Sequence, residues 1–312
     1  MRDPREALSD VVAIPVTPFA QGSVDEEGYR RLLTRLVDAG IRTVTPNGNT
    51  SEFYALGPAE RERLLVVAAE TVDGAADVVA GIGLDADTAV REGRIAQQSG
   101  ATMVMVHQPV HPYISASGWI DYHRAIAGSL PDLGVVLYVR APWVDGRMIR
   151  ALADAEPNVI GVKYAVPDPV TFARVRAEAD VERLIWVAGL AEPYAPSYFA
   201  HGATGFTSGL VSVNPHLSLD LLEALRGGDF ASASSLTTRI ARFEELRAAD
   251  RSANNVSVIK EALHLLGLAD RAVRAPSSTV DERTRAEIET ILADWATDYD
   301  LVAPGRPNLA RA

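Results

Sequence analysis

The sequence contains no cysteine and almost no lysine. Without cysteine the fold cannot rely on disulfide bonds, and a thiolate nucleophile is excluded. Of the 30 basic residues only Lys163 and Lys260 are lysine, so arginine carries nearly all of the positive charge. A lysine that is kept inside an apolar segment therefore points to chemistry that an arginine cannot perform.

An excess of positive charge and long apolar runs are also absent. The formal net charge of -11 disfavours nucleic acid and anionic membranes as partners, and an anionic substrate would need a local cationic group. No apolar run is long enough to cross a membrane, and residues 1–10 alternate in charge without the apolar core of a signal peptide. Together with the lack of cysteine, these features lead us to expect a cytoplasmic protein.

The chain does contain a regular alternation of short apolar segments and segments with helical spacing. The predicted strands are 11–17, 41–45, 77–82, 101–107, 134–139, 159–164, 184–188 and 203–207. The helices predicted after them are 25–39, 58–72, one that starts at Asp85, 118–129, 146–155, 168–179, one that ends near His201, and 215–226. Short connections between eight such units favour a parallel sheet.

This repeat predicts an α/β fold, a (β/α)8 TIM barrel over residues 1–226. An open doubly wound sheet is the alternative, but no Gly-x-Gly-x-x-Gly fingerprint follows the first strand. Residues 227–312 hold only helical patterns, at 230–247, 256–266 and 281–297, which predicts a C-terminal helical appendage. From about Leu301 we expect a poorly ordered tail.

Lys163 stands near the end of the predicted strand 159–164. Burial of an ammonium without a partner is costly, so a desolvated lysine tends to lose its proton and can attack a carbonyl as a neutral amine. The alternative is a lysine whose stem packs inside while its amine reaches solvent. Side chains alternate along a strand, so Gly161 would share the inward face and leave room for the lysine stem. Lys260 is expected on a helix surface.

Polar residues also follow the other predicted strands, where the active sites of TIM barrels lie. Each has a structural alternative: Asn49 and Thr50 could cap a turn, Tyr138 could be a buried aromatic, and Arg140 could form a surface ion pair. Glu52 is expected to hold its loop in shape. The residues at these positions are Asn49, Thr50, Ser51, His107, His111, Tyr138, Arg140, Gly189, Thr207 and Ser208. His107 and His111 could form a metal site, but Pro109 prevents a shared helical face and no third ligand is evident, so no metal is expected.

Five segments, in order and spacing, resemble the Schiff-base lyase superfamily of dihydrodipicolinate synthase and N-acetylneuraminate lyase. They are Ile14-Pro15-Val16-Thr17-Pro18-Phe19, Gly48-Asn49-Thr50-Ser51-Glu52, Leu137-Tyr138, Ile160-Gly161-Val162-Lys163, and Lys260-Glu261-Ala262-Leu263 with Leu266-Gly267-Leu268. The resemblance covers roughly residues 10–297. It implies a TIM barrel, a reaction without a cofactor, a small α-keto acid as substrate and a homo-oligomer, either a dimer or a tetramer.

The resemblance also implies roles for individual residues. Lys163 would be the Schiff-base nucleophile and Tyr138 the proton shuttle. Thr50 would relay protons and, with the backbone amides near Asn49, hold the carboxylate of the keto acid. The expected substrate-binding residues are Asn49, Ser51, Arg140, Gly189, Ser208 and His111.

Departures from the synthase pattern indicate which reaction to expect. The arginine that synthases carry five residues after the tyrosine is Trp143 here, and their Tyr-Tyr pair is Val110-His111. Arg140 and the run 52–56 instead resemble 5-dehydro-4-deoxyglucarate dehydratase. We therefore expect a dehydratase that acts on a 2-keto-3-deoxy sugar acid. The alternatives are a pyruvate-dependent aldolase, a synthase-like condensing enzyme, a metal-dependent aldolase, and a barrel that binds a keto or sugar acid without turnover.

Overall fold

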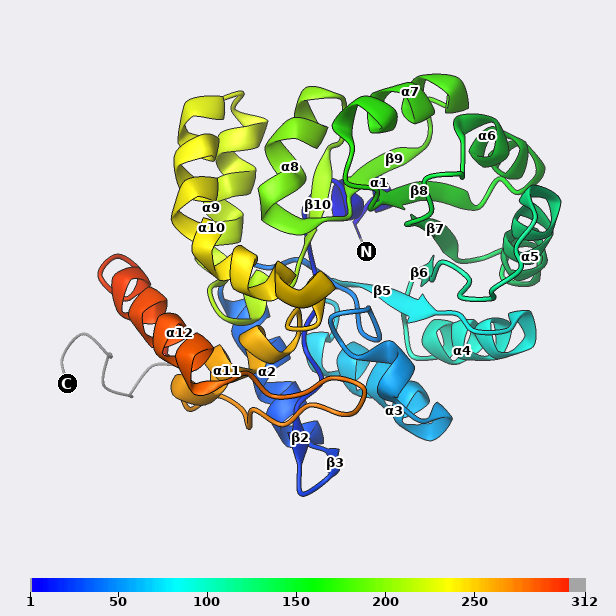
Figure 1. Cartoon of the computed structure of the whole chain (residues 1–312). Coiled ribbons are helices and arrows are strands. Elements are labelled where there is room, and N and C mark those ends of the chain that lie inside the picture. Colours follow the sequence, from blue (N-terminus) through cyan, green and yellow to red (C-terminus); the bar gives the residue numbers. More distant parts are fainter. Residues whose placement is uncertain (1, 303–312) are drawn as a thin grey trace.

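A computed structural model describes residues 2–302, whose core is a closed barrel of eight parallel strands (Figure 1). Around the barrel the strands follow the order β1-β10-β9-β8-β7-β6-β5-β4, and β4 pairs with β1 to close it. Their bounds are β1 Val11–Ala13, β4 Thr43–Val44, β5 Asp77–Ile82, β6 Met103–Val106, β7 Gly134–Val139, β8 Val159–Tyr164, β9 Ile185–Ala188 and β10 Gly205–Ser208. The TIM-barrel prediction is confirmed.

The helices form the outer layer, and most begin at a side chain that caps them. Asp25, Asp85, Asp145 and Asp168 each accept a hydrogen bond from a backbone N–H of the first turn. These four aspartates, which are part of the negative charge of the chain, therefore stabilise the first turns of helices. The bounds are α2 Glu26–Asp38, α3 Pro58–Val72, α4 Ala86–Gln98, α5 Ala116–Ser129, α6 Gly146–Ala155, α7 Pro169–Ala179, α8 Ala191–Ala200 and α9 Pro215–Arg226.

The barrel interior is packed by apolar side chains from alternate strand positions, and helix α1 (Pro4–Leu8) closes its lower end. Ala7 and Leu8 of α1 belong to the interior cluster, together with Val136 and Tyr138 of β7. Two short strands, β2 (Phe19–Ala20) and β3 (Ser23–Val24), form a hairpin after β1. The first strand of the barrel is shorter than the predicted range 11–17. Pro15 and Pro18 have no backbone N–H, so they cannot donate a hydrogen bond to a neighbouring strand.

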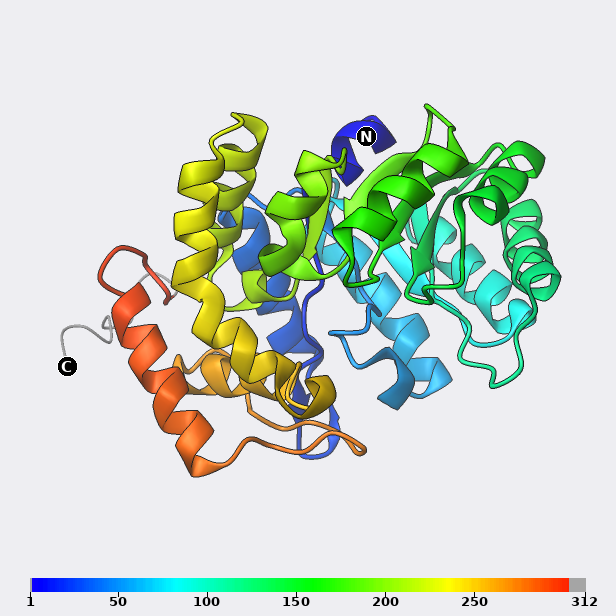
Figure 2. The ribbon, with the colours of Figure 1, turned by 45° about the horizontal axis from the view of Figure 1, so that its top comes forward.

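Three helices follow the barrel, α10 (Phe230–Ser252), α11 (Ser257–Leu265) and α12 (Glu282–Trp295). Figures 1 and 2 show α10 lying beside α8 and α9, and α12 lying beside α11. Their apolar faces share one core with barrel residues, including Phe243, Ile259 and Trp295 from the appendage and Leu32 and Leu210 from the barrel. The domain boundary at 226/227 stays a prediction, but the two regions are packed against each other.

One expectation for the C-terminal region needs correction, while the predicted helix 230–247 agrees with the part of α10 that precedes its non-helical residues at 249–251. Leu301 and Val302, where a poorly ordered tail was predicted to begin, are buried in the shared core. The rest of that predicted tail, residues 303–312, lies outside the described residues. Among the residues described, no helix combines the length and apolar character needed to cross a membrane.

Candidate active site

Lys163 points into the barrel near the carboxyl end of β8 and is only 2% exposed. Its Nζ lies 4.1 Å from the centroid of the Tyr138 ring. Within residues 2–302 no carboxylate lies at ion-pairing distance from this amine. Burial, with a smaller contribution from the nearby Arg140 charge, lowers the pKa of Lys163 from 10.5 to about 7. The amine is therefore available in its neutral, nucleophilic form near neutral pH.

The space for the lysine stem comes from a different glycine than the one expected. A Cβ on Gly189, just after β9, would lie 3.0 Å from Lys163 Cγ and 2.9 Å from Ala165 Cβ. A Cβ on Gly161 would instead meet Leu8 of α1 at 3.1 Å. Gly161 does share the inward face, as predicted, where its nearest side chains are those of Leu8 and Val136, but Gly189 is the glycine that lies against the lysine stem.

Tyr138 stands beside Lys163 on the neighbouring strand, because the parallel register places the two residues opposite each other. Burial raises the pKa of the Tyr138 hydroxyl, while Arg140 and a hydrogen bond from Asn49 act in the other direction. Asn49 Nδ2 donates to the Tyr138 hydroxyl oxygen over 3.2 Å. The phenol thus keeps its own proton, and that proton is free to be given to another group.

The loop after β4 is held in a fixed shape by side-chain hydrogen bonds, both from its own residues and from Thr17. Ser51 is fully buried, and its Oγ donates to Pro15 O over 2.6 Å. Thr17 Oγ1 donates to Ser51 O, and Asn47 Nδ2 donates to Arg61 O. Asn47 and Glu52 both have left-handed backbone angles, with φ of 59° and 61°. These contacts present Asn49 and Thr50, and not Ser51, to the barrel interior.

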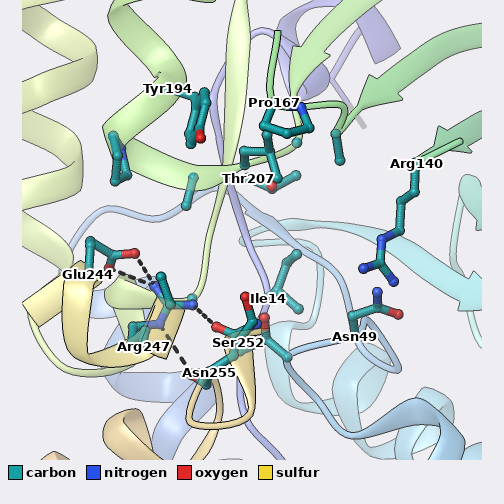
Figure 3. A pocket seen from close by; sticks show the side chains of 18 of the residues that line it. Ile14, Asn49, Arg140, Pro167, Tyr194, Thr207, Glu244, Arg247, Ser252 and Asn255 are labelled. Carbon is teal, nitrogen blue, oxygen red and sulfur yellow. Dashed lines mark hydrogen bonds and ion pairs between the residues drawn. The ribbon is translucent and has the colours of Figure 1, made fainter. Parts of the chain in front are cut away.

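A cavity of about 890 Å³ opens above Lys163 and Tyr138. Asn49, Thr50, Arg140 and Gly189 line it near the lysine, and residues of α10 line its other wall. Figure 3 shows Arg140 extending toward Asn49 on one side of the cavity and Arg247 lying on the opposite side. Arg140 is exposed to solvent, so its guanidinium is hydrated as well as directed at the cavity.

The far wall was not anticipated from the sequence. Arg247 is 5% exposed, and its guanidinium donates to both Glu244 carboxylate oxygens, at 2.6 and 2.9 Å, and to Asn255 Oδ1 at 2.6 Å. Asn255 comes after the non-helical residues at the end of α10. Spacing of three residues hints at the Glu244–Arg247 pair, but no sequence pattern reveals that this part of the appendage folds over the barrel mouth.

Two of the predicted substrate-binding residues, besides Ser51, do not line the cavity. Ser208 is buried at the end of β10, where its Oγ accepts from Val211 N and contacts Ser218 Oγ. His111 is exposed, and its Nδ1 is bonded within its own turn at Tyr113. These three side chains are engaged elsewhere, so their proposed contacts with substrate lack geometric support.

His107 and His111 do not form a joint site. His107 is 1% exposed and bonds through Nε2 to Asn47 O at 2.8 Å, while its ring stacks on Phe53 with centroids 4.2 Å apart. Burial lowers its pKa to about 3, so the ring is neutral. Within residues 2–302 no group of three or more His, Cys, Asp and Glu side chains is arranged to hold a metal ion. His107 instead supports the loop after β4.

Lys260 is not a surface residue, contrary to expectation. It is fully buried on α11, its Nζ pairs with Glu52 Oε2, and the same amine donates to Ala272 O over 2.8 Å. The apolar residues of 256–266 lie on one side of the helix and Ser257, Lys260 and Glu261 on the other, so periodicity alone places Lys260 on a polar face, yet all three of these polar residues are buried.

A parallel barrel with a buried amine at the carboxyl end of a strand defines a class of enzymes, the lyases that form a Schiff base between a lysine and a keto acid. Residues 7–294 match the Dihydrodipicolinate synthetase family, and the chain belongs to that family. It is therefore a class I lyase whose substrate is a small keto acid.

Related proteins carry two different activities in their names. A "Probable 5-dehydro-4-deoxyglucarate dehydratase" from Methylobacterium radiotolerans is 30% identical, over 92% of this chain and 95% of its own. A "4-hydroxy-tetrahydrodipicolinate synthase" from Phenylobacterium zucineum is also 30% identical, over 89% and 94%. The crystal structure of dihydrodipicolinate synthase from Bacillus clausii has a TM-score of 0.90 and 39% identity, over 93% and 99%. Because both kinds of relative occur among these matches, they leave the choice of reaction to the site.

Proposed function

We propose that the chain is a dehydratase of the 5-dehydro-4-deoxyglucarate dehydratase type, with Lys163 as its Schiff-base nucleophile. The observation that carries this proposal is the desolvated amine of Lys163, whose pKa is lowered to about 7 and which lies 4.1 Å from the ring of Tyr138 in the cavity. A neutral amine attacks a carbonyl carbon, whereas an ammonium cannot.

In the first step the Lys163 nitrogen attacks C2 of the keto acid, and the carbonyl oxygen leaves as water. Tyr138 donates the proton that this oxygen needs, because its own proton is not used in the bond from Asn49. Thr50 relays protons and, with the loop amides beside Asn49, binds the C1 carboxylate without adding net charge. The product is an iminium, which draws electrons from C3.

In the second step the Tyr138 phenolate, left when Tyr138 gave up its proton in the first step, takes the proton from C3, and an enamine forms. The enamine expels the 4-hydroxyl group, which receives this proton back from Tyr138 through Thr50 and departs as water. In 5-dehydro-4-deoxyglucarate, decarboxylation follows.

Arg140 supports a dicarboxylate as the substrate. It is a cationic side chain on the cavity wall near Lys163, whereas Arg247 is already neutralised by Glu244. A sugar acid with a second carboxylate far from its keto group needs such a cation in a protein of net charge -11. The polar side chains of α10 on the cavity wall suit the hydroxyl groups that lie between the two carboxylates of such a substrate.

A panel of 2-keto-3-deoxy sugar acids, with products identified by mass spectrometry, tests this proposal. We expect loss of water from the six-carbon dicarboxylate, followed by loss of carbon dioxide, at a rate well above that for monocarboxylates. Turnover of every panel member without loss of water would contradict the dehydratase.

A condensing enzyme or a pyruvate aldolase is the second candidate. It is favoured by the similarity to two crystal structures of dihydrodipicolinate synthase, at 37% and 39% identity. Both reactions pass through the same enamine, but they form or break the bond between C3 and C4. Release of pyruvate from the panel substrates would identify the aldolase, and condensation of pyruvate with an aldehyde would identify the synthase. Binding without any product would indicate a non-catalytic barrel.

The oligomeric state stays a prediction. We expect a homodimer or homotetramer in the cytoplasm, and light scattering of the purified protein would measure the mass. A monomer at micromolar concentration would contradict the expectation.

A further inference from the structure

A buried ion pair joins the loop after β4 to the C-terminal helices. Lys260 of α11 pairs with Glu52 of the loop, and both are almost completely buried. The Lys260 amine also donates to Ala272 O at 2.8 Å and lies 4.0 Å from the centroid of the Phe19 ring. Neither Lys260 nor Glu52 lines the cavity, so the pair does not contact the substrate.

Glu52 is bound at both its backbone and its carboxylate. Its backbone N–H donates to Asn49 O over 3.0 Å, which closes the turn that presents Asn49 and Thr50. Its Oε1 accepts from the backbone N–H of Arg274, a residue of the segment after α11. Its left-handed backbone angle, φ 61°, is unfavourable for a residue other than glycine and persists only when the surroundings hold it.

Arg274 forms a second connection between the same two regions. Its guanidinium donates to Ala55 O at 3.2 Å and to both Glu60 oxygens at 2.6 and 2.7 Å. It also lies 4.3 Å from the Phe19 ring centroid, so this ring contacts both cations. Figures 1 and 2 show the segment after α11 passing beside the β2–β3 hairpin, where these contacts occur.

We infer that Lys260 and Glu52 are positioning residues: their buried pair lets the C-terminal helices hold the loop that places Asn49 against Tyr138. This inference rests on the proposed function of Lys163 and Tyr138. The chain of contacts is continuous, from Lys260 to the Glu52 carboxylate, from the Glu52 backbone to Asn49, and from Asn49 Nδ2 to the Tyr138 hydroxyl.

Removal of Lys260 would leave the Glu52 carboxylate buried without its cation. The loop would then move to bring this carboxylate to water, because an unpaired buried charge is strongly unfavourable. Displacement of Asn49 and Thr50 by about 1 Å is expected to slow the reaction on the order of 10- to 100-fold. A pair that served only global stability would lower the melting temperature without this specific effect.

The kinetic test measures the rate of imine formation with pyruvate, trapped by borohydride, in Lys260→Met and in a control at an exposed ion pair of the C-terminal helices, Arg242→Met. Arg242 pairs with Glu287 across the C-terminal helices, at 2.8 Å, and does not contact the loop. We expect a 10- to 100-fold loss in Lys260→Met, near-normal rates in Arg242→Met and substantial rescue in Lys260→Arg. The double variant Lys260→Met/Asn49→Ala should lose much less than the product of the two single losses, because both act through Asn49.

Hydrogen–deuterium exchange of residues 47–56 gives a readout that does not depend on activity. Exchange in this loop should be faster in Lys260→Met than in the wild type or in Arg242→Met. Unchanged loop exchange in folded Lys260→Met, or losses that multiply with those of Asn49→Ala, would overturn the inference. If Lys260→Met does not fold, Glu52→Gln takes its place with the same expectations. Failure of the wild type to trap any keto acid would instead contradict the proposed function, and the exchange result would still decide the inference.

Discussion

The two lysines of this chain are both buried, each lies about 4 Å from an aromatic ring, and burial lowers the pKa of both, but their charged neighbours differ. Lys260 has a carboxylate partner in Glu52 and a carbonyl acceptor in Ala272. Lys163 has neither among the described residues, and its only charged influence is the cation Arg140. At Lys260 the Glu52 carboxylate opposes the effect of burial and favours the charged amine, which acts as a structural tie. At Lys163 no carboxylate among the described residues opposes burial, so the amine loses its proton more readily and can act as a nucleophile.

Replacement of each lysine by arginine should give the largest contrast. Lys163→Arg should abolish turnover, at least 10⁴-fold, because a guanidinium stays protonated and cannot form an imine. Lys260→Arg should keep most of the activity, because its role needs only a cation. Steady-state rates with the preferred keto acid measure both variants. Comparable losses in the two variants would show that the lysines do not differ in the way described.

Removal of the Tyr138 hydroxyl should make the surroundings of Lys163 more like those of Lys260, which faces Phe19. Tyr138→Phe keeps the ring but removes the proton donor, so we expect a loss of 10²- to 10³-fold in imine formation. Stopped-flow trapping with pyruvate measures this step directly. A loss below tenfold would show that water or Thr50 supplies the proton instead.

The pH dependence of imine formation should report the lowered pKa of Lys163. Folding disfavours the charged amine, so the neutral fraction rises as the pH rises through about 7 and falls roughly tenfold per unit below it. The rate with pyruvate should therefore increase from pH 5 to 8 and then level off. Because burial of the charged amine is unfavourable, Lys163→Met should increase the free energy of unfolding. The increase should be largest at or below pH 7, where the wild-type lysine is charged inside the barrel. A rate that keeps rising to pH 10 would mean that the amine is not desolvated.

Arg140→Ala should have the smallest effect among these predictions, and the size of the effect should differ between two substrates. Arg140 is exposed, so loss of its contact with a distal carboxylate is expected to cost about 1–2 kcal/mol, roughly tenfold in kcat/KM for the dicarboxylate. Imine formation with pyruvate, which has no distal carboxylate, should change less. Equal losses for both substrates would mean that Arg140 acts on Lys163 itself.

The sequence was sufficient for the barrel and for the central pair of the site. Eight alternating units predict a closed parallel sheet, and the register of β7 and β8 places Tyr138 beside Lys163 because both lie near the ends of their strands. These features are local or follow from the period of the strand. The residue types at 138 and 163 then indicate the chemistry.

The remaining features depend on contacts between segments far apart in the chain. Glu52 and Lys260 are separated by 208 positions, and nothing near Lys260 in the sequence indicates a carboxylate partner. The change of direction near the end of α10, which brings Asn255 to Arg247, depends on backbone angles at 249–251 that residue type does not predict. Ser51 and Ser208 have the hydroxyl groups that a binding site needs, but packing directs both away from the cavity.

Reductive trapping tests the difference between the two lysines most directly. The protein is incubated with pyruvate and borohydride, digested, and the position of the reduced adduct is read by mass spectrometry. We predict one adduct per chain, at Lys163, with Lys260 unmodified. An adduct at Lys260, or no adduct with any keto acid tested, would contradict the assignment of Lys163 as the nucleophile.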